Sequence, residues 1–338
     1  MENEVISRIR NEVAKAIVGQ DDKINKVLMC IIADGDILLE DSPGTGKTVL
    51  ASAFADALGV DHGRIQFTSD TMPSDIVGLV SYNQKTCEYE IRKKHIFDEN
   101  IEIFDEINRA PAKTQSALLS IMEEKKYSFD VFGGQSEEKL PELFSTIATM
   151  NPNTSPYEGT NSLPQPMLDR FMIALSLGYP NKQDEIEMLK RKASNSLDYK
   201  VQKVTNETEI LRIRKEVQNV YVSSLVLEYI SDLAITSRQS TELKEGISPR
   251  GEINLLNLAR ANAYFKGRVD KMGRYYVTIG DIDELFVDAN IHRIVLKDQN
   301  QRNFKIIDDK RVNALKNVLR DTKAKNRAYS ALDLGADD

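Results

Sequence analysis

Cysteine, histidine and long apolar runs are scarce in this chain of 338 residues, and each scarcity excludes a class of protein. The two cysteines, Cys30 and Cys87, cannot build a disulfide framework and lack the close spacing of zinc ligands. The three histidines, His62, His95 and His292, lie far apart in the sequence, so we expect no metal site on them. This cysteine usage indicates a reducing compartment, and we expect the chain to be cytoplasmic.

Apolar residues do not accumulate to a length that crosses a membrane. The longest run near the N-terminus, residues 27–33, stops at Asp34 and is far shorter than the roughly 20 residues that a span needs. Ahead of it, residues 5–17 carry apolar side chains four apart, which is typical of an amphipathic helix and not of a signal peptide. We expect no insertion into a membrane.

Positive charge is also in short supply, since 45 lysines and arginines stand against 52 aspartates and glutamates, for a net charge of −7. Non-specific binding to nucleic acid needs a surplus of basic side chains, so a nucleic-acid partner is not expected. Hydrophobic residues at 41% and charged residues at 29% are typical of a soluble globular protein. The length suggests about two domains of roughly 150 residues each.

The first half of the chain alternates short β-branched segments with helical stretches. The expected strands are residues 36–40, 64–68, 101–104, 145–150 and 172–177. This alternation predicts an α/β fold in which a mostly parallel sheet lies between layers of helices.

Helical periodicity replaces the strand signals from Asn181 onward. Apolar residues follow helical spacing from 222 to 233, and another helix should begin at Ser248, an N-cap residue followed by Pro249. The boundary is expected near Gly178. We expect three parts, namely an α/β domain at 1–180, an all-helical domain at 181–296 and a charged, helical C-terminal tail with a frayed end at 297–338.

A glycine-rich turn between an expected strand and helix is the strongest local motif. Residues 38–49 read Leu-Leu-Glu-Asp-Ser-Pro-Gly-Thr-Gly-Lys-Thr-Val. Backbone N–H groups of such a loop cradle the β- and γ-phosphates of a nucleotide, while Lys47 supplies a positive charge and the Thr48 hydroxyl binds Mg²⁺. A plain turn with a solvated lysine is the alternative, which the flanking strand and helix disfavour. The motif predicts a nucleotide site.

One position departs from the usual P-loop pattern, which has glycine where this chain has Asp41. Aspartate tolerates left-handed backbone angles better than most residues, so the turn should survive. A carboxylate close to phosphates is expected to weaken nucleotide affinity.

An acidic pair follows the expected strand at 101–104. Asp105 would hold Mg²⁺ at the carboxyl end of the strand, usually through water, and Glu106 would polarise the attacking water. An isolated Asp-Glu pair more often starts a solvated loop, but its position downstream of a P-loop lysine favours the metal and catalytic roles.

The segment from Asp105 to Leu119, Asp-Glu-Ile-Asn-Arg-Ala-Pro-Ala-Lys-Thr-Gln-Ser-Ala-Leu-Leu, resembles the Walker B block of the MoxR family of AAA+ ATPases. The resemblance extends over most of residues 15–295, and its other segments are residues 18–20, 67–68, 73–78, 82–86, 168–171 and 248–250. It implies a P-loop AAA+ core with a five-stranded parallel sheet, a smaller helical lid, and ATP and Mg²⁺ as cofactors.

The resemblance also implies which residues bind the nucleotide and which act on it. The nucleotide-binding positions are Val18, Gly19, Gln20, Ser42, Pro43, Gly44, Thr45, Gly46, Lys47, Thr48, Val49 and Arg250, with Thr48 and Asp105 on the metal. The catalytic positions are Lys47, Asp105, Glu106, Asn151, Arg170 and Arg250. Among these, Asn151 corresponds to sensor 1, Arg170 to the arginine finger that acts on a neighbouring subunit, and Arg250 to sensor 2; Arg109 is a second, lower-ranked candidate for the finger.

Structural alternatives exist for the last three residues. Asn151 precedes Pro152 and could simply form a turn. Arg170 could make a buried salt bridge, and Arg250 could be a surface arginine with an incidental carboxylate partner. Because a cation in the first turn of a helix opposes the macrodipole at a cost of a few tenths of a kcal/mol, Arg250 is expected to meet an anion.

The remaining implications of the resemblance concern assembly and partners. Hairpins are expected near 79–93, turning at Gln84 to Thr86, and near 127–141, turning at Gly133-Gly134; in AAA+ rings such hairpins often face the pore or the partner. The family implies a ring, most often a hexamer, that uses ATP hydrolysis to remodel, mature or assemble a protein client, often a von Willebrand factor A domain protein. Two alternatives stay open, a DNA-translocating or helicase-like motor and a nucleotide-gated scaffold with little hydrolysis.

Overall fold

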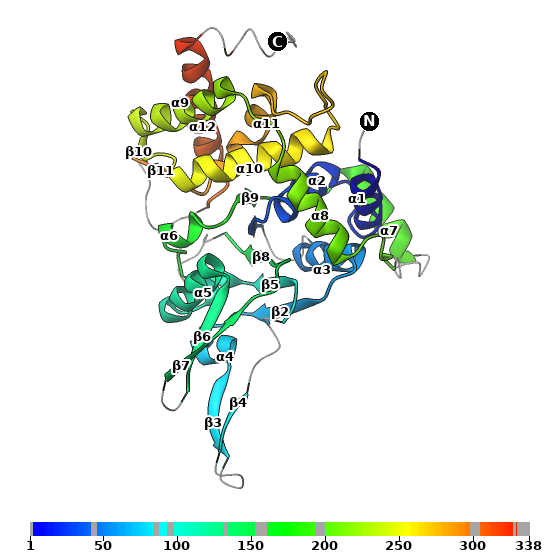
Figure 1. The fold of residues 1–338 in the computed structure, drawn as a ribbon, viewed down its shortest axis with the longest axis vertical. Helices are drawn as coiled ribbons and strands as arrows, with labels where there is room; N and C mark the ends of the chain where they lie inside the picture. The colour runs from blue at the N-terminus through cyan, green and yellow to red at the C-terminus, as the bar shows by residue number, and fades with distance from the viewer. Residues whose placement is uncertain are drawn as a thin grey trace.

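A computed structural model describes residues 3–41, 46–83, 88–92, 98–131, 134–152, 161–193, 200–297, 305–326 and 329. Figure 1 shows an α/β region in the middle, a helical region above it and two hairpins that project below.

The centre of the molecule is a five-stranded sheet in the order β2-β5-β8-β1-β9, and all neighbouring strands are parallel. Its strands are β1 (Ile37–Glu40), β2 (His62–Gln66), β5 (Ile101–Asp105), β8 (Ser145–Met150) and β9 (Ile173–Leu175). All residues of β1, β5, β8 and β9 are buried, as is typical of a parallel sheet that is covered on both faces, and most of their side chains are apolar. The expected fold class and all five expected strands are confirmed.

Helices cover both faces of this sheet. They are α1 (Glu4–Ala16), α2 (Asp21–Ile32), α3 (Lys47–Leu58), α4 (Pro73–Val77), α5 (Ala112–Glu124) and α6 (Gln165–Leu168). In the strand order, the connection through α3 leads from β1 toward the β2 edge of the sheet. The connection through α5 leads in the opposite direction, from β5 to β8. Because such crossovers are right-handed, α3 and α5 lie on opposite faces. Helix α1 packs against α3.

Two antiparallel hairpins project from this core (Figure 1). One pairs β3 (Leu79–Asn83) with β4 (Glu88–Arg92), and the other pairs β6 (Lys126–Val131) with β7 (Gly134–Lys139). Both hairpins were expected from the sequence. The turn expected at residues 84–86, and Gly133 of the other turn, lie outside the described residues.

The C-terminal half is helical, as the sequence predicts. Its elements are α7 (Lys182–Ala193), α8 (Glu207–Gln218), α9 (Ser224–Gln239), α10 (Pro249–Phe265), α11 (Ile279–Asn290) and α12 (Asp309–Lys325), with a small sheet of β10 (Leu243–Glu245) and β11 (Val295–Leu296). Helix α10 starts as expected, since Ser248 accepts a 3.1 Å hydrogen bond from the Gly251 amide and Pro249 occupies the first helical position. No described helix combines the length and the apolar character needed to cross a membrane.

The segment after residue 297 differs from the expected separate tail. Helix α12 packs on α9 and α11 and buries Ala314, Leu315 and Val318. Ahead of it, the amides of Ile306 and Ile307 donate 2.7 and 2.6 Å hydrogen bonds to the buried carboxylate of Glu40 at the end of β1. Residues 305–325 are therefore part of the helical region. The sequence does not show this packing clearly, because the apolar stripe of α12 is short and lies among many charged residues.

Candidate active site

The carboxyl ends of β1 and β8 meet around Lys47. Its ammonium donates hydrogen bonds to the backbone oxygen of Asp41 at 2.6 Å, to that of Met150 at 3.3 Å and to the side-chain oxygen of Asn151 at 3.0 Å. Burial lowers the pKa of Lys47 against the opposing effect of the nearby carboxylates. The hydrogen-bond partners of this buried cation are all neutral oxygens, so its charge is available to an anionic ligand.

The start of α3 adds backbone donors beside this cation. Gly46, at φ 85°, is the N-cap residue and has no side chain with which to cap the first turn, which contains Lys47, Thr48 and Val49. The N-terminal N–H groups of a helix are a natural phosphate site. Ser42, Pro43, Gly44 and Thr45, which the sequence also assigns to nucleotide binding, lie outside the described residues.

The acidic pair stands at the end of the neighbouring strand β5. The carboxylate of Asp105 accepts a 2.6 Å hydrogen bond from the Thr149 hydroxyl and a 2.5 Å hydrogen bond from Arg64. Glu106 has left-handed backbone angles, φ 56° and ψ 46°, which cost a non-glycine residue of the order of 1 kcal/mol. This turn directs the Glu106 side chain to Asn151, whose amide donates to it at 3.3 Å.

Asn151 therefore joins the lysine to the acidic pair. Its side-chain oxygen accepts from Lys47 and its side-chain nitrogen donates to Glu106, so both halves of the amide are used and its orientation is fixed. Its backbone oxygen accepts a 3.0 Å hydrogen bond from Asn108. The structure thus brings together Lys47, Glu106 and Asn151, as the sequence predicts.

The acidic residues fit a magnesium ion that is shared with a nucleotide. Across the described ranges, no three His, Cys, Asp or Glu side chains cluster as a protein-only metal cage. Mg²⁺ in nucleotide sites typically takes one or two protein oxygens and fills its octahedral shell with phosphates and water. The Asp105 carboxylate and the Thr48 hydroxyl are oxygen ligands of this kind.

The Asp41 carboxylate, which the sequence led us to expect close to the phosphates, is hydrogen-bonded to residues that follow β9. The carboxylate accepts hydrogen bonds from the Ser176 hydroxyl at 2.7 Å, the Leu177 amide at 2.5 Å and the Gly178 amide at 3.2 Å. These donors stand just beyond β9, the strand next to β1, and a buried carboxylate is stabilised by such contacts. The hydrogen bond of Lys47 goes to the backbone oxygen of Asp41 and not to its carboxylate.

Residues 18–20, which the family resemblance assigns to nucleotide binding, lie close to the end of β9. Gln20 donates a 2.9 Å hydrogen bond to the backbone oxygen of Leu177. Gly19 has φ 73°, and a Cβ atom at this position would collide with the carboxylate of Asp184 on α7. Residues 18–20 therefore lie where the core passes into the helical region.

Arg170 and Arg250 lie together at the opposite edge of the sheet. Arg170 precedes β9, donates to the backbone oxygens of Leu119 at 3.2 Å and Pro166 at 3.1 Å, and pairs with Glu123. Arg250 pairs with the same Glu123 carboxylate at 2.8 Å. Both arginines line a pocket with Asp34, Gly35 and Asp36, which precede β1.

This edge holds the amino ends of the parallel strands, whereas Lys47 stands at the carboxyl ends. The four residues of β1 alone separate the two edges by roughly 13 Å. The structure therefore does not bring Arg250 to a phosphate on Lys47 of the same chain. Arg250 instead pairs with two carboxylates, Glu123 at 2.8 Å and Asp169 at 3.7 Å, which agrees with the structural alternative of a carboxylate partner.

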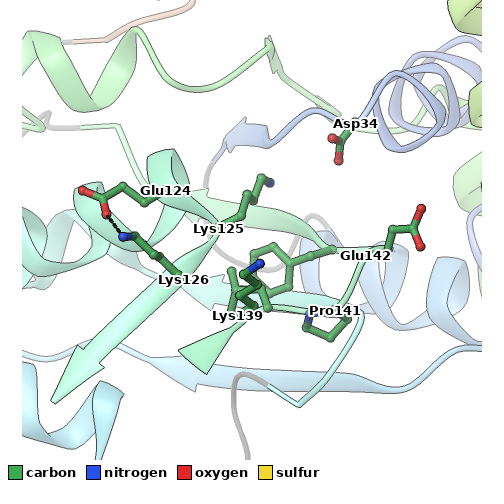
Figure 2. Close-up of a pocket in the computed structure, with 9 residues that line it drawn as sticks. Asp34, Glu124, Lys125, Lys126, Lys139, Pro141 and Glu142 are labelled. Carbon is green, nitrogen blue, oxygen red and sulfur yellow. Dashed lines mark ion pairs between the residues drawn. The ribbon is translucent and has the colours of Figure 1, made fainter. Parts of the chain in front are cut away.

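A second pocket adjoins the arginine pocket and shares Asp34 and Lys125 with it (Figure 2). The ammonium of Lys125 lies 3.9 Å from the Asp36 carboxylate and 5.2 Å from the centre of the Phe144 ring. Lys126 forms the ion pair with Glu124 that Figure 2 marks, at 3.3 Å. This edge is a mixed-charge surface and not a single basic patch.

The remaining candidate, Arg109, pairs with Glu106 at 3.2 Å, on the lysine side of the sheet. It is thus separate from Arg170 and Glu123. Sequence reasoning did not single out Thr149, Arg64 or Glu123. Thr149 carried a signal, because it lies near the end of β8, two residues before Asn151, and Glu123 carried none.

Comparisons with known proteins agree with this architecture. The family described as "ATPase family associated with various cellular activities (AAA)" matches residues 36–173, and the AAA lid domain matches residues 235–313. The Bacillus subtilis protein YeaC is 37% identical over 292 residues, which make up 86% of this chain and 87% of YeaC.

Two further relatives cover the core and the helical region together. The Mycobacterium tuberculosis chaperone MoxR1 is 33% identical over 294 residues, 84% of this chain and 74% of MoxR1. A crystal structure of a Cytophaga hutchinsonii protein, assigned as an ATPase, has a TM-score of 0.79 and 35% identity, and the match covers 94% of this chain and 93% of that one. The chain therefore belongs to the MoxR family of AAA+ ATPases.

Proposed function

We propose that the chain hydrolyses ATP with Mg²⁺ and uses the reaction to remodel, mature or assemble a protein partner. The observation that carries the proposal is the chain of contacts from Lys47 through Asn151 to Glu106. It links a phosphate-binding cation to a carboxylate that can act on water. The side-chain amide of Asn151 lies between Lys47 and Glu106 and so sets the distance between them.

We propose a role for each residue that its position supports. Lys47 and the first turn of α3 hold the β- and γ-phosphates, and Asn151 keeps Glu106 directed toward the water that attacks. Glu106 polarises that water and accepts its proton. Asp105 and Thr48 would hold Mg²⁺, which would neutralise the charge that develops on the phosphates. Gly19 and Gln20, at the junction with the helical region, contact the adenine.

Arg170 and Arg250 are proposed to act on the nucleotide of a neighbouring subunit. Each lies at the edge of the sheet away from Lys47, where a second copy of the chain could bring a phosphate. A head-to-tail arrangement places the edge that holds Lys47 (the lysine edge) of one subunit against the edge that holds Arg170 and Arg250 (the arginine edge) of the next. Such heterologous contacts form a ring when the rotation between subunits closes. We propose a hexamer.

The output is proposed to be mechanical and to act on a protein in the cytoplasm. The projecting hairpins β3-β4 and β6-β7 are surfaces that a client could contact (Figure 1). The relative MoxR1 is named a chaperone, which supports a protein client. A von Willebrand factor A domain protein is the client class that we propose.

Both alternatives lose support. The net charge of −7 disfavours a motor that tracks DNA. The scaffold with little hydrolysis was suggested by Asp41, whose carboxylate is hydrogen-bonded to Ser176, Leu177 and Gly178, and this supports the ATPase over the scaffold.

The decisive experiment uses Glu106→Gln, which should bind ATP and hold its client. Proteins captured by this variant with ATP, and not by Lys47→Ala, would be purified and added to the wild-type chain. Stimulated ATP turnover and a changed conformation or assembly state of the captured protein would support the proposal. Stimulation by DNA and not by the captured protein would favour the motor, and Mg²⁺-independent or absent turnover would contradict the proposed ATPase.

A further inference from the structure

Asp169, the residue before Arg170, is contacted by three side chains of the helical region, one of which is Arg250, at 3.7 Å from its carboxylate. Its carboxylate accepts a 2.7 Å hydrogen bond from the hydroxyl of Ser248, the N-cap residue of α10. The same carboxylate oxygen forms an ion pair with Arg293 at 2.5 Å. The helical region thus holds the residue that adjoins the proposed arginine finger.

Arg293 also binds the backbone on both sides of Arg170. Its guanidinium donates to the backbone oxygens of Asp169 at 2.5 Å and Phe171 at 2.6 Å. A third nitrogen of the group donates to Ala289 at the end of α11, at 3.0 Å. Only a planar guanidinium can bind all these oxygens at once, because a lysine ammonium is a single point.

His292, the residue before Arg293, contacts the same backbone segment. The Nε2 atom of His292 lies 2.8 Å from the backbone oxygen of Phe171, and because a carbonyl oxygen only accepts, Nε2 donates. Burial lowers the pKa of His292 well below its usual value, so the ring is neutral. Gln165, on α6, donates back to the backbone oxygen of Arg293 at 2.7 Å.

These contacts are buried, whereas the finger itself faces a pocket. His292 is 0% exposed and Arg293 2% exposed, and both occupy the turn that follows α11. Arg170 lines the pocket with Arg250 and Glu123. A buried set of directional contacts can fix a backbone, and the backbone from Asp169 to Phe171 decides where the Arg170 side chain points.

We propose that Arg293 is a positioning residue for Arg170. With Asp169, Ser248 and His292, it makes the position of the arginine finger follow the position of the helical lid in the same subunit. A lid that shifts when its own subunit binds nucleotide would therefore move the finger offered to the neighbouring subunit. This inference rests on the proposed ATPase function, which assigns Arg170 its role.

The test substitution is Arg293→Lys, which keeps the positive charge and removes the planar guanidinium with its three donor nitrogens. Its matched control is Arg268→Lys, which changes an arginine that pairs with Asp281 at 2.7 Å, within the helical region. The first readout is hydrogen exchange of the backbone amides in residues 165–172. We expect faster exchange there in Arg293→Lys and an unchanged rate in Arg268→Lys.

The second readout is steady-state ATP hydrolysis. Misplacing a reacting group by about 1 Å can cost roughly 10²-fold in rate, so kcat should fall by that order in Arg293→Lys while KM changes little. A third readout assigns the defect to one side of the interface. Mixed with Lys47→Ala subunits, Arg293→Lys should regain turnover, and mixed with Arg170→Ala subunits it should not.

Two results would overturn the inference. One is exchange in residues 165–172 that matches the wild type, and the other is rescue of Arg293→Lys by Arg170→Ala subunits. If Arg293→Lys does not fold, Asp169→Asn removes the same ion pair and should give the same exchange pattern. Absence of ATP turnover in the wild-type chain would refute the proposed function alone, because the exchange measurement does not depend on turnover.

Discussion

Lys47 and Asn151 are 104 residues apart in the sequence, and in the structure the ammonium of Lys47 donates a 3.0 Å hydrogen bond to the side-chain oxygen of Asn151. The other half of that amide reaches Glu106. A phosphate that binds Lys47 competes for the same ammonium, so nucleotide binding should be felt at Asn151 and, through it, at Glu106.

Substitutions at the two ends of this chain of contacts should separate binding from hydrolysis. Lys47→Ala should abolish ATP binding, because the positive charge on the phosphates is lost. Glu106→Gln should still bind ATP and hydrolyse it far more slowly, because an amide cannot accept the proton of the attacking water. Calorimetric titration and a phosphate-release assay measure the two effects. Equal loss of binding in both variants would show that Glu106 has a different role.

Asp41→Gly, which restores the common P-loop glycine, should destabilise the fold and leave ATP affinity within a few-fold of the wild type. The substitution removes the acceptor of three hydrogen bonds at the end of β9, and leaving such donors unpaired costs about 1–3 kcal/mol each when they are buried. Urea denaturation and ATP titration measure the outcome. The stability of Asp41→Asn, which retains an oxygen acceptor, should lie between that of Asp41→Gly and that of the wild type. Much tighter ATP binding in Asp41→Gly, without loss of stability, would contradict the geometry.

The strands, the P-loop and the acidic pair could be predicted from the sequence because each depends on neighbouring residues. Buried parallel strands require apolar runs, and the phosphate site requires its glycines and Lys47 within one turn. The partner of Arg250 could not be predicted in this way. Whether a lid helix begins at the lysine edge or the opposite edge of the sheet depends on long-range packing, and Glu123 has no local signature. The contacts of Arg293 with three carbonyl oxygens and one carboxylate likewise appear only in the fold.

Glu102 provides a prediction about stability and pH. It lies in the middle of the sheet on β5, is 0% exposed, and its carboxyl oxygens have no hydrogen-bond partner among the described residues. Burial raises its pKa to about 9, and the charge of Glu99 adds to this effect. The folded chain therefore keeps a proton that the unfolded chain releases above the ordinary pKa of 4.5.

Glu102 should therefore make the free energy of unfolding fall as pH rises from about 4.5 to about 9, by up to about 1.4 kcal/mol per pH unit. Glu102→Gln cannot lose a proton, so its stability relative to the wild type should grow with pH across this window. Urea denaturation at pH 5 and pH 9 tests this, with the exposed Glu245→Gln as the control. A difference between Glu102→Gln and the wild type that is the same at both pH values would show that Glu102 is already ionised in the folded chain.

The last prediction tests whether the two edges of the sheet meet between subunits. Arg170→Ala should lower ATP turnover by roughly 10³- to 10⁵-fold if the effect of arginine fingers in other P-loop enzymes applies, with a much smaller change in ATP affinity. An Arg170→Ala subunit keeps an intact lysine edge, and a Lys47→Ala subunit keeps an intact arginine edge. A mixture of the two should regain part of the wild-type rate, because a complete site forms wherever the intact edges adjoin.

Arg250→Ala should behave in the same way as Arg170→Ala in this mixing experiment, because both side chains pair with Glu123 at one edge. A mixture of Arg170→Ala with Arg250→Ala should therefore stay inactive, since each interface lacks one of the two arginines. Native mass spectrometry would establish that mixed rings are present in every sample. If such rings form and Lys47→Ala subunits rescue neither arginine variant, the two arginines serve the structure of their own subunit, and the shared site is wrong. If Lys47→Ala rescues Arg170→Ala but not Arg250→Ala, only the finger acts across the interface, and Glu123 is the partner that Arg250 keeps during turnover.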